Sequence, residues 1–242
     1  MSEQKGHIHP LNQIMHQVVE VFDEMGFDIF QIPEIETEYF NFDALNVPDS
    51  HPARDEQDTF WFKNRPGMLA RTQTSAGQVK GPRARGVPLK ILYFGKVYRN
   101  ETTDATHEAV FHQFECAAIG KDLNLGHMKF TIESIFKKLF GENTKTRLRP
   151  GYFPFVEPGV EVDMSCFKCE GKGCSVCKNS GWIEVLGAGM LHPKVLERGG
   201  VNPREYQGYA FAFGWDRLAM MLYGIDDIRL LQSGDLRFNN QF

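Results

Sequence analysis

The sequence lacks the two features that mark most membrane and secreted proteins. None of its 242 residues belong to an apolar run near the ~18 residues that a membrane-spanning helix requires. Residues 1–10 are polar and contain no apolar segment of the kind found in a secretory signal. We therefore expect a cytoplasmic protein that has no contact with a membrane.

Positive charge is also scarce. The 27 lysines and arginines are outnumbered by 31 aspartates and glutamates, so the net charge is −4. A protein that grips RNA over a wide surface is usually basic, because it must neutralise phosphates. If RNA is a partner, this chain alone does not supply most of the phosphate contacts. Repeats and low-complexity segments are absent too, and the length suits a core of ordinary size.

Cysteine is rare, yet four of the five cysteines fall within twelve residues, spaced Cys-x2-Cys-x4-Cys-x2-Cys. In a cytoplasmic chain such a cluster indicates a metal site before it indicates disulfides. Two such pairs suit a closed, tetrahedral zinc site of the structural kind, and four reduced thiols without metal are the alternative. The residues concerned are Cys166, Cys169, Cys174 and Cys177. Cys116 stands alone and is expected to be a small core residue.

Hydrophobic periodicity predicts strands in the middle of the chain and helices outside them. Helical spacing of apolar residues is found over residues 10–25 and 128–140. Strands are expected at 27–32, 69–75, 91–99, 110–119, within 146–162, at 182–186 and at 209–213. A short helix is expected at 203–206 and a closing helix at 217–223, whereas 34–65 and 80–88 are expected to be loops. This pattern predicts an α+β fold in which helices flank an antiparallel sheet.

Three groups of polar residues stand where a site could form. Gln113 and Glu115 share one face of a strand, which is either solvated or a floor whose oxygen atoms accept hydrogen bonds from an ammonium group. Arg99 ends the preceding strand and is either a surface arginine or a clamp for a phosphate. Arg217 follows Gly214 where a strand meets the last helix, and a cation at that helix end suggests an anionic ligand.

Together these groups resemble the three signature motifs of class II aminoacyl-tRNA synthetases. More specific strings resemble the alpha subunit of bacterial-type phenylalanyl-tRNA synthetase: GHIHPL (6–11), NFDALN (41–46), HPARD (51–55), RTQTS (71–75), DATH (104–107), FHQFE (111–115), YFPF (152–155), GAGM (187–190) and YGIDDIR (223–229). Because the resemblance runs over residues 6–242, we expect one class II catalytic domain spanning 1–242, with a four-cysteine knuckle at 166–177.

The resemblance implies a ligase that activates phenylalanine with ATP and transfers it to tRNA(Phe). The expected ATP-binding residues are Arg99, Glu101, His107 and Arg217, which match positions of motifs 2 and 3. Arg99 is expected on the α-phosphate and Arg217 toward the γ-phosphate, and these two are the catalytic candidates because preorganised cations stabilise the developing charge. The carboxylate of the substrate itself attacks the α-phosphorus.

The resemblance also assigns the amino-acid pocket and the metals. The ammonium and carboxylate of phenylalanine are expected on Gln73, Ser75, Gln113 and Glu115. Phe153 and Phe155 match residues that pack against the substrate ring, with plain core packing as the alternative, and Ala210 matches an alanine that limits para substituents. Glu157 matches a glutamate that contacts magnesium, and Mg²⁺ is expected with ATP in any case. Some family members have the cysteine pattern and others lack it, which indicates a structural metal.

The chain departs from the family in two places. Alpha subunits carry an N-terminal coiled-coil arm that contacts tRNA, whereas this sequence begins just before the core, so we expect the arm to be absent and tRNA charging by this chain alone to be in doubt. Ala212 stands where motif 3 has its first glycine, and its methyl group is expected to crowd the adenine site. The family enzyme is usually a heterotetramer with a larger beta subunit. The helix at 10–25 and the strand after it match the subunit-interface motif of the family, so an oligomer is expected, with a homodimer as the possibility for this chain alone.

Three functional interpretations stay open at this point. The chain is an active phenylalanine-activating enzyme, a module that binds phenylalanine and ATP without charging tRNA, or a subunit that is active only with its beta partner. Retention of Arg99, Arg217, Gln113 and Glu115 favours the first over the second. A zinc-dependent nucleic-acid-binding protein built on the knuckle is disfavoured by the negative net charge and the lack of a basic aromatic surface.

Overall fold

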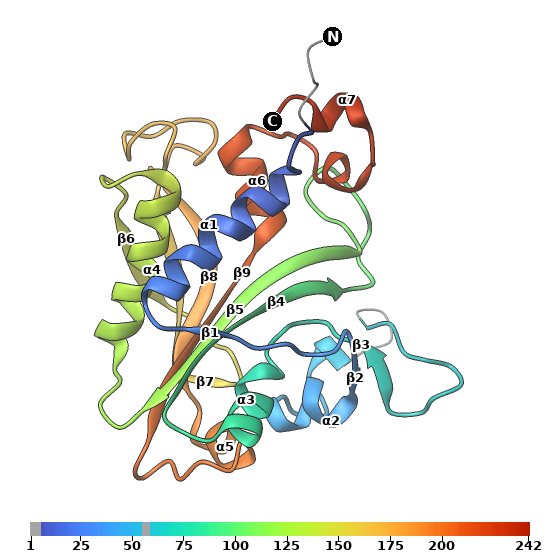
Figure 1. Cartoon of the computed structure of the whole chain (residues 1–242), viewed down its shortest axis with the longest axis vertical. Coiled ribbons are helices and arrows are strands. Elements are labelled where there is room, and N and C mark those ends of the chain that lie inside the picture. Colours follow the sequence, from blue (N-terminus) through green and yellow to red (C-terminus); the bar gives the residue numbers. More distant parts are fainter. Residues whose placement is uncertain (1–5, 55–58) are drawn as a thin grey trace.

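The computed structural model describes residues 6–54 and 59–242 (Figure 1). The first five residues and Asp55, which belongs to one of the family-like strings, therefore lie outside the described residues. A seven-stranded sheet has the order β1-β4-β5-β9-β8-β7-β6. Its strands are β1 (Asp28–Ile29), β4 (Leu89–Tyr98), β5 (Val110–Gly120), β9 (Gln207–Gly214), β8 (Trp182–Leu191), β7 (Val156–Ser165) and β6 (Thr146–Pro150). Every neighbouring pair is antiparallel except β1, which runs parallel to β4, so the predicted antiparallel sheet is a mixed one.

Helices cover both faces of this sheet, as the predicted α+β fold requires. On one face pack α1 (Pro10–Glu24), α4 (Leu125–Phe140) and α6 (Trp215–Tyr223), over the largest cluster of buried side chains. On the other face lie α2 (Glu38–Asn41), α3 (Gly77–Arg85) and α5 (Pro193–Arg198), with the hairpin β2 (Ile35–Thr37) and β3 (Met68–Ala70). Short helices η1 (Asp43–Leu45), η2 (Pro52–Arg54), η3 (Ile228–Gln232) and α7 (Leu236–Asn239) complete the described chain.

Helix α1 forms where the apolar spacing predicts it. Pro10 occupies the first helical position, where its missing N–H costs nothing, and the His9 ring accepts a hydrogen bond from the Leu11 N–H. Gly26, with φ of 75°, follows the end of the helix. None of the described helices combines the length and the apolar character needed to span a lipid bilayer.

The prediction of a loop at residues 80–88 is wrong, because α3 runs through most of it. Two glycines, Gly77 and Gly81, let this helix approach the sheet. A Cβ atom at Gly77 would lie 2.6 Å from the ring of Tyr93, and one at Gly81 would lie 2.3 Å from Ile91. The helix ends at Gly86, whose φ is 75°. These glycines therefore serve close packing between helix and strand.

Other segment predictions also need correction. Residues 34–65, expected to be a loop, contain β2, α2, η1 and η2. The short helix expected at 203–206 is a turn, and the short helix of this region is α5 instead. The strand expected at 27–32 is reduced to the two residues of β1, whereas β8 runs further than predicted, to Leu191.

Candidate active site

The register of the central strands builds the floor of a pocket on the sheet face that carries α3. Glu115 of β5 pairs with Ala212 of β9, which pairs with Gly187 of β8. One row further along, Ala117 pairs with Ala210, which in turn pairs with Gly189. Of these residues, Glu115, Ala212, Gly187 and Ala210 line the cavity, so its floor consists of small residues beside one carboxylate.

The pocket has a volume of about 520 Å³ and brings together nine of the predicted site residues. These are Gln73, Ser75, Arg99, Glu101, Gln113, Glu115, Phe153, Phe155 and Ala210. They come from the segment before α3, the end of β4, the face of β5, the segment before β7, and β9. The strand ends and loops thus converge on one cavity, as the family motifs predict.

Glu115 is the most strongly held side chain of the pocket. It is 1% exposed, and each of its carboxylate oxygens accepts two hydrogen bonds. Thr74 Oγ1 and Ser75 Oγ donate to Oε2 over 2.7 and 2.9 Å, and Gln78 Nε2 and the Tyr93 hydroxyl donate to Oε1 over 2.7 and 3.0 Å. All four donors are neutral, and the structure shows no ion pair between Glu115 and another described residue.

Burial and hydrogen bonding act on Glu115 in opposite directions. Burial raises the pKa of this carboxyl group, and the bonds from Gln78, Thr74, Ser75 and Tyr93 oppose the rise. Burial and the neighbouring carboxylate raise the pKa of Tyr93 well above its ordinary value, so Tyr93 remains a protonated donor. A buried anion that has only neutral partners favours a ligand that brings a positive charge.

Gln113 offers a ligand the NH₂ group of its side-chain amide, whereas the sequence suggested the amide oxygen. Its Oε1 accepts a hydrogen bond from the backbone N–H of Thr74 over 3.0 Å, and the Thr74 hydroxyl, whose single proton goes to Glu115, lies 3.1 Å away. A backbone N–H can only donate, which fixes the oxygen on that side. The NH₂ group is therefore the part available to a ligand, and it suits a carboxylate rather than an ammonium group.

Gln78 belongs to the pocket, although the sequence did not indicate it. It is 1% exposed on α3, and its Oε1 has no hydrogen-bond partner within the described part of the chain. Leaving a buried acceptor unpaired costs about 1–3 kcal/mol, so this oxygen suits a donor supplied by a ligand. Recognition of α3 would have pointed to it, since Gln78 lies in the first turn of that helix, directly after the segment that carries Gln73 and Ser75.

Phe153 and Phe155 form an aromatic wall. Their ring centroids are 6.1 Å apart with an angle of 27° between the planes, and both rings are half-buried. A Cβ atom at Gly187 would lie only 2.7 Å from Phe153 Cζ, so this ring rests on the backbone of β8. Both rings line the cavity, and Phe155 also packs against the core cluster that contains Phe42 and Leu45.

Arg99 and Glu101 line the pocket where β4 ends. Arg99 Nε donates to the Thr72 carbonyl over 3.2 Å, Nη1 lies 3.8 Å from Glu101 Oε1, and the guanidinium stands 5.1 Å from the centroid of the Phe111 ring. About 40% of the Arg99 side chain is exposed, so its charge is accessible from the pocket. Arg99 thus lies where a phosphate clamp was predicted.

Three predicted site residues are not part of the pocket lining. His107 is exposed and its Nδ1 lies 3.1 Å from Asp104. Arg217 is exposed on the first turn of α6. Glu157 directly follows a lining residue, but its exposed carboxylate pairs with His192 Nε2 over 3.4 Å.

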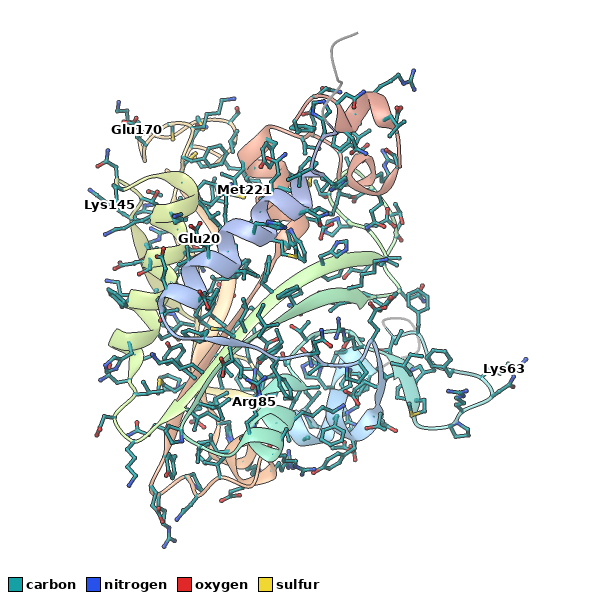
Figure 2. All side chains as sticks on the ribbon, in the orientation of Figure 1. Glu20, Lys63, Arg85, Lys145, Glu170 and Met221 are labelled. Atoms are coloured by element: carbon teal, nitrogen blue, oxygen red, sulfur yellow. The ribbon has the colours of Figure 1, made fainter. Side chains whose placement is uncertain are left out.

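The four clustered cysteines form a separate centre between β7 and β8. Their Sγ atoms all lie within 4.8 Å of one another, and three of the pairs are 3.7 to 3.8 Å apart. Tetrahedral zinc with Zn–S bonds near 2.3 Å places its sulfurs ~3.8 Å apart, whereas a disulfide requires ~2.05 Å. Backbone N–H groups of Gly173, Cys174 and Gly181 donate to the sulfurs over 3.2 Å, which favours thiolates. Figure 2 shows this knuckle, marked by Glu170, at the same end of the molecule as Met221 of α6, which packs against it.

Comparison with known proteins agrees with this geometry. The family model "tRNA synthetases class II core domain (F)" matches residues 1–242. The phenylalanine–tRNA ligase alpha subunit of Streptococcus mutans is 52% identical over 241 residues, which cover 98% of this chain and 69% of that relative. The alpha subunit of Clostridium perfringens is 49% identical over 237 residues, with the same coverage.

The chain belongs to the phenylalanine–tRNA ligase alpha subunit family. Its catalytic core is of class II, as the sequence predicted. Among solved structures, the pyrrolysyl-tRNA synthetase of Desulfitobacterium hafniense aligns with a TM-score of 0.71 at 16% identity, over 94% of this chain and 74% of that one, which shows the shared fold.

Two residues singled out in the sequence, Ala212 and Cys116, lie on opposite faces of the sheet. Ala212, which replaces the expected motif 3 glycine, lies in the floor between Glu115 and Gly187 and lines the cavity. Cys116, on the opposite face of β5, is fully buried in the main core, which confirms its predicted structural role.

Proposed function

We propose that this chain activates phenylalanine with ATP to form phenylalanyl-adenylate and then passes the phenylalanyl group to tRNA(Phe). The observation that carries the proposal is the combination of a buried carboxylate that has no direct ion pair, a floor of small residues and an aromatic wall in one cavity. An aromatic amino acid matches both features, because its ammonium group suits the carboxylate and its planar ring suits the aromatic wall. The family relationship supports this chemistry.

Each pocket residue has a proposed part in binding phenylalanine. The α-ammonium group faces Glu115, Ser75 and the unpaired oxygen of Gln78. The carboxylate lies toward the NH₂ group of Gln113 and the guanidinium of Arg99. The ring lies against the wall of Phe153 and Phe155 and above Ala210, with Gln73 held in the lining by its bond to the Asn41 carbonyl.

ATP is proposed to lie toward the Arg99 end of the pocket. Arg99 and Glu101 contact it there, and His107 and Arg217 act from outside the present lining. Apart from the four cysteines, the described residues contain no cluster of three metal-ligating side chains, so Mg²⁺ is proposed to be held mainly by the phosphates, with Glu157 as a carboxylate contact. When bound, Mg²⁺ neutralises phosphate charge.

Phenylalanine-dependent exchange of pyrophosphate into ATP tests the activating step. The wild-type chain is expected to show exchange with phenylalanine and much less with tyrosine. Arg99→Ala is expected to lower the rate by at least about 100-fold, because a cation on the reacting phosphate is lost. Arg237→Ala, which removes an arginine that is 92% exposed and paired with Asp235, is the matched control and keeps the wild-type rate. Equal exchange with tyrosine would contradict the proposal.

We also propose that the partner is a beta subunit and that the chain acts in the cytoplasm. The relatives are named alpha subunits, and reduced cysteines suit a reducing compartment. Exchange assays with and without added beta subunit separate an independent activating core from a subunit that needs its partner. A homodimer is tested by the mass of the chain in solution. Failure to exchange even with the beta subunit would favour a binding module.

The knuckle is proposed to hold structural Zn²⁺. Its four sulfurs have the separations that tetrahedral thiolate coordination requires, and no open position is left for a substrate. The expected stoichiometry is one zinc per chain by elemental analysis. Cys169→Ser is expected to lose the metal and to lower the melting temperature, whereas Cys116→Ser retains the metal. Equal zinc content in both variants would refute this assignment.

A further inference from the structure

Strand β4 places one side chain against Glu115 from within the sheet. Tyr93 pairs directly with Glu115 in the register of β4 and β5, so both side chains point to the same face. The Tyr93 hydroxyl donates to Glu115 Oε1 over 3.0 Å, and Tyr93 is 0% exposed. The other three donors to this carboxylate come from the segment before α3 and from α3 itself. Tyr93 therefore holds the carboxylate from the side away from the ligand.

The ring of Tyr93 has no room to move. A Cβ atom at Gly77 would lie 2.6 to 2.8 Å from three of its ring atoms, and the ring packs in the cluster that contains Ile91 and Ala117. The hydroxyls of Thr74 and Ser75, by contrast, can rotate toward other acceptors. Among the three hydroxyl donors, Tyr93 is thus the one whose position the surrounding packing fixes most firmly.

Tyr93 does not line the pocket, so it acts through Glu115 and not on the substrate. We propose that Tyr93 is a positioning residue for the α-ammonium group of phenylalanine, because its hydroxyl, held by a tightly packed ring, keeps the Glu115 carboxylate correctly oriented. The inference rests on the proposed phenylalanine activation. According to this inference, Tyr93 affects the affinity for phenylalanine although it lies outside the cavity.

The charged and titratable groups around Glu115 are few. On β4 there is Tyr93 itself, and on β5 the buried thiol of Cys116, whose pKa is raised by burial, lies on the opposite face. The guanidinium of Arg71 interacts with Glu115 at longer range and donates to the backbone carbonyls of Ile32, Pro33 and Lys96. The neighbours on α3 and β9 are uncharged.

The sign of the pH effect follows from these contacts. Burial raises the pKa of Glu115, and the Tyr93 hydrogen bond opposes that rise because it favours the ionised form. Phenylalanine affinity is therefore expected to fall as the pH falls through the pKa of Glu115. Loss of the Tyr93 hydroxyl moves this fall to higher pH.

Calorimetric titration of Tyr93→Phe in the full chain tests the inference. At neutral pH the Kd for phenylalanine is expected to rise about tenfold, since a hydrogen bond to a charged group is lost. Binding of 3-phenylpropanoate, which has the same ring and carboxylate but no ammonium group, is expected to be unchanged. The matched control is Tyr209→Phe, because Tyr209 is also buried on the sheet but its hydroxyl pairs with Thr131 Oγ1 over 2.9 Å.

The outcomes separate this inference from the function on which it rests. If the wild-type chain binds phenylalanine but Tyr93→Phe binds it equally well with the same pH profile, the role of Tyr93 is refuted and the proposed function stands. If both ligands weaken alike, or if Tyr209→Phe behaves like Tyr93→Phe, the hydroxyl is only a structural contact and the inference is overturned. If the wild-type chain binds no phenylalanine, the proposed function falls and the inference falls with it.

Discussion

The variant Gly187→Ala should change the shape of the pocket much more than it changes the stability of the fold. The added Cβ would lie 2.7 Å from Phe153 Cζ and 3.2 Å from Cε1 and Cε2. Carbon atoms in contact lie ~3.5–4.0 Å apart, so the ring must retreat by about 1 Å. Because one side of the ring borders a cavity, it can move into that space. We expect the unfolding free energy to fall by about 1 kcal/mol, at the low end for overpacking.

The effect on binding should be larger than the effect on stability. A ring displaced into the pocket occupies volume that the substrate ring needs, and the Kd for phenylalanine should rise at least about tenfold in a calorimetric titration of Gly187→Ala. Gly120→Ala is the control, because the same methyl group would meet only Leu123, at 3.4 Å or more, near the far end of β5. Unchanged affinity in Gly187→Ala, together with a normal melting temperature, would show that Phe153 does not set the pocket.

Three further predictions address charge, size and metal. Glu115→Gln is expected to weaken phenylalanine binding about 100-fold. Because the pKa of Glu115 is raised in the folded chain, the wild type should lose stability relative to this variant as the pH rises through that pKa. Melting curves at several pH values would show this loss. Ala210→Gly removes a methyl group from the floor and is expected to admit para-halogenated phenylalanines in the exchange assay, with no such gain from Ala117→Gly, which pairs with it outside the lining. Removing zinc with a chelator is expected to lower the melting temperature, and zinc, but not magnesium, should restore it.

Elements with regular periodicity could be predicted from the sequence because one face of each is buried. Helices α1 and α4 and the antiparallel pair β4 and β5 were found close to their observed bounds. The alternation that puts Glu115 and Phe114 on opposite faces of β5 is confirmed by the burial of Phe114 in the main core. Helix α3 could not be found in this way, because its glycines and its proline have the composition of a loop and only contact with β4 explains them.

The site was predicted through the family motifs more than through the residues alone. The motifs predicted nine of the residues that line the pocket. No sequence pattern indicates Tyr93, because its contact with Glu115 depends on the pairing of β4 with β5. The orientation of the Gln113 amide also depends on a tertiary contact, to Thr74. His107 and Arg217 are exposed, and within the described residues neither side chain is packed into the pocket, although the His107 ring is held by Asp104.

The cysteine knuckle bears on the pocket through the hairpin that it closes. Strand β7 runs from Val156, which lines the pocket, to Ser165, and β8 returns from Trp182 past Gly187. The knuckle joins the strands next to the pair Ser165 and Trp182, and the ladder has a register shift between Val162 and Asp163. A slip of one residue in β8 would turn Gly187 to the opposite face and put the side chain of Leu186 or Ala188 toward Phe153 instead. We therefore expect the proposed zinc site, together with the pairing of β8 with β9, to help keep Gly187 facing Phe153.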